Sequence, residues 1–177
     1  MLPFSSLGER LDDIVKYTAI YAVVFLMMMM SVISAPAPFD VMMKVPFLTI
    51  MIYYWAAFRP TIIPPLIAFL IGLLYDILSG APAGLHAMLF VLIQWAISDQ
   101  RAFLSAQSFL LLWLVFSILH AVTVFLQWLI FGLVDINWVN ISMVLPDIFV
   151  GVVAFPFLFW IWHGLHGLLP KLSPSLR

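Results

Sequence analysis

The amino-acid sequence predicts an all-α integral membrane protein, built as a six-helix transmembrane bundle with a short amphipathic helix at its N-terminus. Two features of the composition support this fold class: 66% of the 177 residues are hydrophobic, and only 8% are charged. Ordinary soluble domains carry about 25% charged residues. The third feature is that the hydrophobic residues group into six runs, as expected for membrane-embedded helices.

The same composition excludes several classes of protein. So few charges would not cover the surface of a water-soluble enzyme, and disordered chains are poor in hydrophobic residues. The net charge of −1 offers no electrostatic surface for nucleic acid. Because the chain contains no cysteine, disulfides, thiolate metal sites and cysteine redox motifs are excluded as well. We therefore expect one domain that lies almost entirely within the bilayer.

Each of the six apolar runs is bounded by charged residues or by turn-forming residues. The runs are 17–35, 45–58, 61–79, 85–98, 108–134 and 148–169. A helix needs about 20 apolar residues to cross a bilayer. The second and fourth runs have only 14 residues each, a length that also suits re-entrant or buried segments. The fifth run, with 27 residues, must tilt, kink or protrude.

The distribution of positive charge favours six complete spans with both termini in the cytoplasm. In this arrangement only Lys44, of the seven Lys and Arg residues, lies outside. The six on the cytoplasmic side are Arg10, Lys16, Arg59, Arg101, Lys171 and Arg177. Cytoplasmic loops of membrane proteins carry an excess of Lys and Arg. If the two short runs did not span, Arg59 would also lie outside and the asymmetry would weaken.

Residues 1–16 precede the first run and predict a short amphipathic helix at the cytoplasmic interface. One helical face carries Leu7, Leu11, Ile14 and Val15, and the other carries Glu9, Arg10, Asp13 and Lys16. A polar tail is the alternative interpretation. A cleaved signal peptide fits less well, because the apolar run that follows is longer than the usual stretch of about 7–15 residues. The predicted organisation is therefore 1–16 amphipathic segment, 17–169 transmembrane domain and 170–177 cytoplasmic tail.

Asp76 is the most informative single residue, because it lies inside the third predicted span, where an ionised carboxylate needs a partner or a watery cavity. It belongs to a series of residues spaced four apart: Ala68, Gly72, Asp76, Gly80 and Gly84. The small residues of this series allow a neighbouring backbone to approach closely. Two interpretations remain open: an interaction or packing corner centred on a buried acid, or an Asp that caps the fourth helix.

The candidate partners of Asp76 are His86 and Lys44, which we expect on the same outer side of the membrane. Arg59 is expected at the opposite membrane face, which makes a direct pair with Asp76 unfavourable.

A polar stripe in the fifth span contains Ser117, His120, Thr123 and Gln127 at helical spacing. Such a stripe normally supplies hydrogen bonds between helices, each worth about 1 kcal/mol or less. A proton relay from Asp76 to His120 is the functional alternative.

The sequence displays no constellation of a nucleophile, a base and an orienting group. It contains no Walker loop, HExxH, GxSxG or dinucleotide fingerprint. His163 and His166 have a spacing that suits one metal ion, but no third ligand is near them in the sequence, which favours a structural interpretation. We therefore expect neither an enzyme nor a catalytic, cofactor-binding or metal site.

The stretch across the second and third spans resembles the rod shape-determining protein MreD family. The resemblance rests on Lys44-Val45-Pro46 before the second span, Tyr54-Trp55 near its end, Arg59-Pro60 before the third span, Gly72, Asp76-Ile77-Leu78-Ser79-Gly80, and Gly84. These residues match in order and spacing over about 40 positions, and elsewhere the likeness is confined to length and hydropathy.

The resemblance implies a non-enzymatic scaffold in the bacterial inner membrane, as part of the cell-elongation machinery. The family associates with MreC, a single-pass membrane protein, and through it with the glycosyltransferase and transpeptidase that build side-wall peptidoglycan. The family is also similar in fold to the substrate-binding subunits of energy-coupling-factor vitamin transporters. The residues expected to contact the partner or to support that contact are Arg59, Gly72, Asp76, Gly80 and Gly84.

A substrate-binding membrane subunit of a small-solute, vitamin-like transporter is the alternative function. The expected number of spans and the buried Asp76 permit this alternative. Against it, many transporters contain interrupted helices in repeated halves, and the sequence shows no such symmetry.

Overall fold

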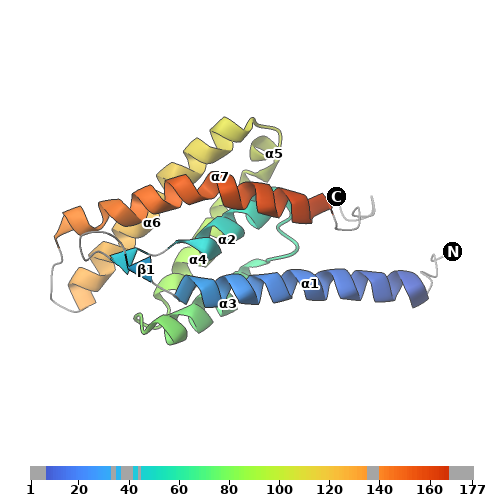
Figure 1. The fold of residues 1–177 in the computed structure, drawn as a ribbon, viewed down its shortest axis with the longest axis horizontal. Coiled ribbons are helices and arrows are strands. Elements are labelled where there is room, and N and C mark those ends of the chain that lie inside the picture. Colours follow the sequence, from blue (N-terminus) through green and yellow to red (C-terminus); the bar gives the residue numbers. More distant parts are fainter. Residues whose placement is uncertain (1–6, 33–34, 37–41, 44, 135–139, 168–177) are drawn as a thin grey trace.

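The computed structural model describes residues 7–32, 35–36, 42–43, 45–134 and 140–167, and this part of the protein is almost entirely helical (Figure 1). The α-helices are α1 (Leu7–Val32), α2 (Phe47–Phe58), α3 (Pro65–Ser79), α4 (Leu85–Asp99), α5 (Arg101–Leu104), α6 (Phe109–Val134) and α7 (Leu145–Gly167). A 3-10 helix, η1 (Ile141–Met143), precedes α7. The two-residue strands β1 (Ala35–Pro36) and β2 (Met42–Met43) form an antiparallel pair.

The prediction of an all-α protein is confirmed, and each of the six apolar runs coincides with one helix. The third run differs at its start, because α3 begins at Pro65 and not at residue 61. Pro64 has an extended backbone (φ −65°, ψ 164°), as expected for a residue that precedes proline, and Pro65 occupies the first turn, where its missing N–H costs nothing. The short helix α5 lies between the fourth and fifth runs and was not predicted.

The N-terminal segment does not form a separate helix, whereas the predicted boundary of the transmembrane domain at residue 16 stays a prediction. The helix α1 runs without interruption from Leu7 to Val32, so its amphipathic part and the first apolar run belong to one element. Figure 1 shows the N-terminal half of α1 extending past the other helices. Its position at a membrane interface stays a prediction, and residues 1–6 and the tail at 170–177 lie outside the described residues.

The short helix α2 is the centre of the molecule. Every residue of Leu48–Ala57 is buried, and α1, α4, α5, α6 and α7 pack against it. The ring of Tyr53 meets those of Phe116 (centroids 5.4 Å apart) and Phe155 (5.7 Å) edge to face, and its hydroxyl donates to the backbone carbonyl of Leu112 (2.9 Å). A helix that is apolar on all sides is a buried helix. The second run is therefore enclosed by protein.

The helices around α2 expose large apolar side chains, as expected for contact with lipid. Examples are Leu66 on α3, Ile118 on α6 and Phe157 on α7. Two described helices are long and apolar enough to cross a membrane: α6, and the first 20 residues of α7. The other apolar stretches among the described residues, Tyr21–Val32, Phe47–Phe58, Pro65–Ser79 and Leu85–Asp99, are shorter.

Candidate functional site

Asp76 lies near the C-terminal end of α3 and is completely buried. Its Oδ2 atom accepts from the backbone N–H of Gly84 (2.9 Å) and, more distantly, from that of Ala87 (3.5 Å). Its Oδ1 atom accepts from the backbone N–H of His86 (3.1 Å). The Nδ1 atom of His86 also lies 2.6 Å from Oδ1, within hydrogen-bonding distance.

These contacts confirm that Asp76 caps the N-terminus of α4. The first N–H groups of a helix lack partners within the helix, and the positive end of the helix dipole favours a carboxylate there. The N-cap residue of α4, Gly84, has no side chain to accept from them. Asp76 supplies the missing acceptor from the preceding helix. A buried charge with this many hydrogen bonds is stabilised within the protein.

The predicted partners of Asp76 have different outcomes. The pairing with His86 is confirmed, whereas Lys44 lies outside the described residues. Arg59 ends α2, where its backbone N–H donates to the carbonyl of Trp55 (2.8 Å). Because most of α3 separates Arg59 from Asp76, a distance of about 16 Å along the helix axis, the structure does not bring these two residues together.

The glycines of the series serve two separate purposes. Gly72 allows α3 and α4 to approach closely, because a Cβ atom placed there would lie only 2.4 Å from the Cα atom of Ala87. Gly80 and Gly84 have left-handed backbones, with φ of 70° and 95°, which residues with a Cβ atom rarely adopt. Gly80 ends α3 in this conformation, a common end for a helix. The predicted close approach of a neighbouring backbone is thus confirmed, and that neighbour is α4 of the same chain.

The polar stripe of α6 forms one bond between helices and two within α6. The Nε2 atom of His120 lies 3.2 Å from the carbonyl oxygen of Asp147 on α7. By contrast, the hydroxyls of Ser117 and Thr123 donate to carbonyls of α6 itself, those of Trp113 (2.7 Å) and Leu119 (2.8 Å). The prediction that the stripe bonds to other helices therefore holds for His120 and is wrong for these two hydroxyls.

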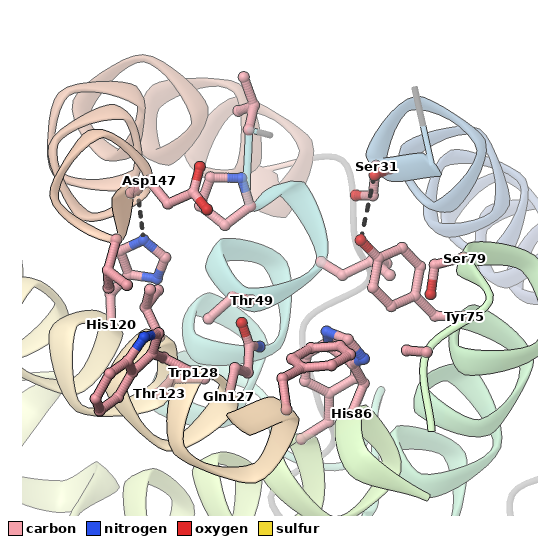
Figure 2. Close-up of a pocket in the computed structure, with 18 of the residues that line it drawn as sticks. Ser31, Thr49, Tyr75, Ser79, His86, His120, Thr123, Gln127, Trp128 and Asp147 are labelled. Carbon is pink, nitrogen blue, oxygen red and sulfur yellow. Dashed lines mark hydrogen bonds between the residues drawn. The ribbon is translucent and has the colours of Figure 1, made fainter. Parts of the chain in front are cut away.

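Gly80 and His86, which lie near Asp76, and His120, Thr123 and Gln127 of the α6 stripe form parts of the lining of one cavity with a volume of about 550 Å³. Figure 2 shows His120, Thr123 and Asp147 on one side of it, and Tyr75, Ser79 and His86 on the other. The lining comes from the C-terminal ends of α1, α3 and α6 and from the N-terminal ends of α2, α4 and α7, so the cavity lies at one end of the molecule.

The two C-terminal histidines both belong to α7. His163 is exposed and its ring stacks on that of Phe159 (centroids 6.0 Å apart, planes at 9°), and the side chain of His166 lies outside the description. No group of three or more His, Asp or Glu side chains is placed to hold a metal ion within the described ranges.

Sequence reasoning missed two residues that shape the cavity. Asp147 follows Pro146 in the first turn of α7, and this Pro-Asp pair is a recognisable helix start that places α7 earlier than predicted. Gly151 leaves room for the His120 ring, because a Cβ atom at Gly151 would lie only 2.1 Å from Nε2. A single glycine in an apolar run carries no signal of this kind, because its meaning depends on a residue in another helix.

Comparison with known proteins identifies a family. The family model described as rod shape-determining protein MreD matches residues 13–166, which is most of the chain. The chain matches no curated protein and no solved structure. The similarity in fold to energy-coupling-factor subunits therefore stays a prediction. The matched region contains all but the first six residues of α1 and continues almost to the end of α7, and it includes Gly72, Asp76, Gly80 and Gly84. The chain belongs to the rod shape-determining protein MreD family.

Proposed function

We propose that this protein is a non-enzymatic scaffold of the cell-elongation machinery in the bacterial inner membrane. It acts in rod-shape determination and regulates side-wall peptidoglycan synthesis through a transmembrane partner of MreC type. The observation that carries the proposal is the family match over residues 13–166. The partner links the scaffold to the peptidoglycan glycosyltransferase and transpeptidase, which the scaffold reaches only indirectly.

In this proposal the chain crosses the membrane six times, with both termini in the cytoplasm. The arrangement of helix ends supports it, because the C-terminal ends of α1, α3 and α6 meet the N-terminal ends of α2, α4 and α7 around one cavity. This alternation is what six consecutive spans produce. The cavity end then faces outward, and α5 with the loop that contains Arg59 faces the cytoplasm, as the positive-inside rule favours.

The corner formed by Gly72, Asp76, Gly80 and Gly84 supports the partner contact from within the protein. The space beside Gly72 is filled by the backbone of Ala87 of the same chain, and the carboxylate of Asp76 is buried against α4. Neither residue is exposed to a second protein. Their role in partner binding is therefore to fix α4 against α3, so that the outer face of α4 has a defined position.

We place the partner helix in the groove between α4 and α6, a space of about 430 Å³. Its lining is apolar except for one threonine: Leu89, Leu92, Ile93, Ala96, Val115, Ile118, Leu119, Val122, Thr123 and Leu126. Helices associate in membranes by close packing against small residues, and Ala96 and Thr123 are the small and hydroxyl residues that such packing uses. A groove of this composition suits the transmembrane helix of a single-pass partner.

The test compares two substitutions of equally exposed residues. Ile118→Trp fills the groove, whereas Leu66→Trp adds the same bulk on α3, outside it; the two side chains are 67% and 68% exposed. We expect Ile118→Trp to weaken co-purification with an MreC-type partner and to round rod-shaped cells that depend on this protein. Leu66→Trp should leave both properties as in the wild type.

Wild-type shape and full co-purification of Ile118→Trp, at an equal protein level in the membrane, would contradict the docking surface. Rod shape in cells that lack the protein altogether would contradict the proposed function itself.

The solute-binding subunit of a vitamin-like transporter is the second candidate, and the polar cavity at the outer end favours it. Accumulation of a labelled solute that requires this protein in intact cells would support that candidate. A normal solute content with rounded cells after depletion would support the scaffold.

A further inference from the structure

The cavity at the end of the bundle has the size of a small-molecule site. Its volume of about 550 Å³ lies within the range of ligand pockets, roughly 300–1,000 Å³. Residues of six helices line it, and Figure 2 shows their side chains around a common space.

His120 provides an unused hydrogen-bond acceptor in the wall of this cavity. Its Nε2 atom contacts a backbone carbonyl, which only accepts, so Nε2 carries the proton and Nδ1 of the neutral ring is an acceptor. The residue is only 3% exposed, and Nδ1 has no hydrogen-bond partner in the described part of the protein. Figure 2 shows this nitrogen on the side of the ring turned away from Asp147. A buried acceptor of this kind is costly unless a donor reaches it.

Two further hydroxyl groups of the lining also present acceptors. The Tyr75 hydroxyl donates to the carbonyl of Ser31 (3.2 Å), and the Thr123 hydroxyl donates to that of Leu119 (2.8 Å). Each hydroxyl has one proton, so only its oxygen lone pairs remain for a ligand. His120, Tyr75 and Thr123 thus each present an acceptor, and a molecule that carries hydrogen-bond donors complements these three groups.

The charged side chains of the described lining do not call for a charged ligand. His86 is paired with Asp76, and Asp147 is likewise engaged in an interaction of its own. Aromatic side chains form much of the remaining wall, among them Tyr75, Phe90 and Trp128. Flat faces of this kind favour a planar ring, which they contact by stacking or edge to face.

We propose that this cavity binds a small, uncharged molecule with a planar ring and at least one O–H or N–H donor, which donates to Nδ1 of His120. The ligand reaches the site from the end of the bundle where α1, α3 and α6 end, and it contacts six helices at once. The inference does not rest on the scaffold function.

The experiment uses two pairs of probes that differ only in the donor. Indole has an N–H group that 1-methylindole lacks, and 2-naphthol has an O–H group that 2-methoxynaphthalene lacks. Binding to the full-length protein in nanodiscs is measured by the rise in the midpoint of thermal unfolding and by calorimetry. We expect each donor to bind about tenfold more tightly than its methylated partner, because the methylated probe leaves the buried acceptor without a donor. Methylation also raises partitioning into lipid, so partitioning alone would give the opposite order.

Two variants test whether the preference for probes with a donor comes from His120 and Thr123. His120→Phe keeps a ring that stacks on Phe116 (centroids 5.5 Å apart) but removes the acceptor, and Thr123→Val removes a second acceptor with little change in shape. The matched control is Ser117→Ala, since Ser117 also donates to a carbonyl of α6 but does not line the cavity. We expect His120→Phe to bind both members of each pair equally, Thr123→Val to bind the donors more weakly, and Ser117→Ala to behave as the wild type.

Three results would overturn the inference: no binding of any probe, equal binding of the two members of each pair to the wild type, or an undiminished preference in His120→Phe. If His120→Phe does not fold, Thr123→Val decides, and wild-type affinity for both donors in that variant then overturns the inference. Shape and partner binding of His120→Phe in cells report on the scaffold separately, because His120 lines the cavity and not the groove between α4 and α6, whereas Thr123 lines both. Failure of one proposal is therefore distinguishable from failure of the other.

Discussion

At the scale of single residues, one carboxylate joins two helices. Asp76 accepts hydrogen bonds from the start of α4 and from the imidazole of His86, while its own backbone belongs to α3. Hydrogen bonds to charged groups are worth about 1.5–3 kcal/mol each, more than those between neutral groups. The carboxylate of Asp76, which would be unfavourable inside a membrane without partners, therefore helps to hold α3 and α4 together.

Asp76→Asn should destabilise the protein by about 1–3 kcal/mol, because the amide replaces one acceptor by an NH2 group that faces backbone donors. Thermal unfolding in detergent measures the change. Asp99→Asn is the matched control: Asp99 is exposed at the C-terminal end of α4, where a negative charge is unfavourable to the helix dipole. An Asp76→Asn variant as stable as Asp99→Asn would show that the capping bonds contribute nothing.

The position of Asp76 and one of its partners could be predicted from the sequence, because a buried acid needs a partner and His86 follows within one turn and one short loop. The partner of His120 could not be predicted in this way. Its contact with Asp147 depends on how α6 and α7 lie beside each other, and on the absence of a side chain at Gly151. Neither condition is visible in the spacing of residues along α6.

At the scale of elements, the α3–α4 pair makes the most extensive helix contact in the described part of the protein. The four-residue spacing of Ala68, Gly72 and Asp76 predicted such a contact, because positions four apart share one helical face. The start of α3 at Pro65 also follows from local chemistry. The continuity of α1 through residue 16 does not follow from local chemistry. The change from a mixed to an apolar sequence there indicates a change in the surroundings of the helix, but it does not indicate that the helix ends.

Glycine substitutions separate steric from conformational effects in this pair. Gly72→Ala should cost about 1–3 kcal/mol, because its new Cβ atom meets the backbone of Ala87, which cannot move without shifting α4. Gly80→Ala meets no atom within 4 Å but should cost about 1–2 kcal/mol through its left-handed backbone. Unfolding midpoints of the purified variants report both effects.

The control for both substitutions is Gly164→Ala on α7, which meets no atom within 4 Å and has an ordinary helical backbone. This variant should be as stable as the wild type or slightly more stable. If Gly72→Ala were no less stable than Gly164→Ala, the close approach of α3 and α4 would not limit the size of residue 72.

At the scale of the whole molecule, the six apolar runs could be predicted because hydrophobicity is a local property of the sequence. The cavity could not, because its lining comes from residues that lie as far apart as Ser31 and Asp147. No periodicity within one run indicates that the ends of six helices will leave a space between them. The enclosure of α2 was likewise only one of two interpretations of a short run.

The absence of cysteine allows a direct test of the proposed orientation. Ser142→Cys lies within η1, at the end of the molecule proposed to face outward, and Ser105→Cys lies between α5 and α6, at the other end; both serines are exposed. A membrane-impermeant maleimide should label Ser142→Cys in intact spheroplasts and Ser105→Cys only after permeabilisation. The reverse pattern would show that the topology is inverted. Labelling of both cysteines before permeabilisation would contradict the six consecutive spans, because the two positions would then lie on the same side of the membrane.

The enclosure of α2 has a consequence for the synthesis of the protein. Of the helices that pack against α2, only α1 precedes it in the chain, and α4, α5, α6 and α7 are translated later. When α2 leaves the ribosome, most of its final neighbours therefore do not yet exist. At 12 residues it is also shorter than the length that crosses a bilayer unaided, about 20 residues. The helix α2 consequently reaches its final packing only after the last third of the chain has been translated. Until then it is in contact with the insertion machinery or with lipid.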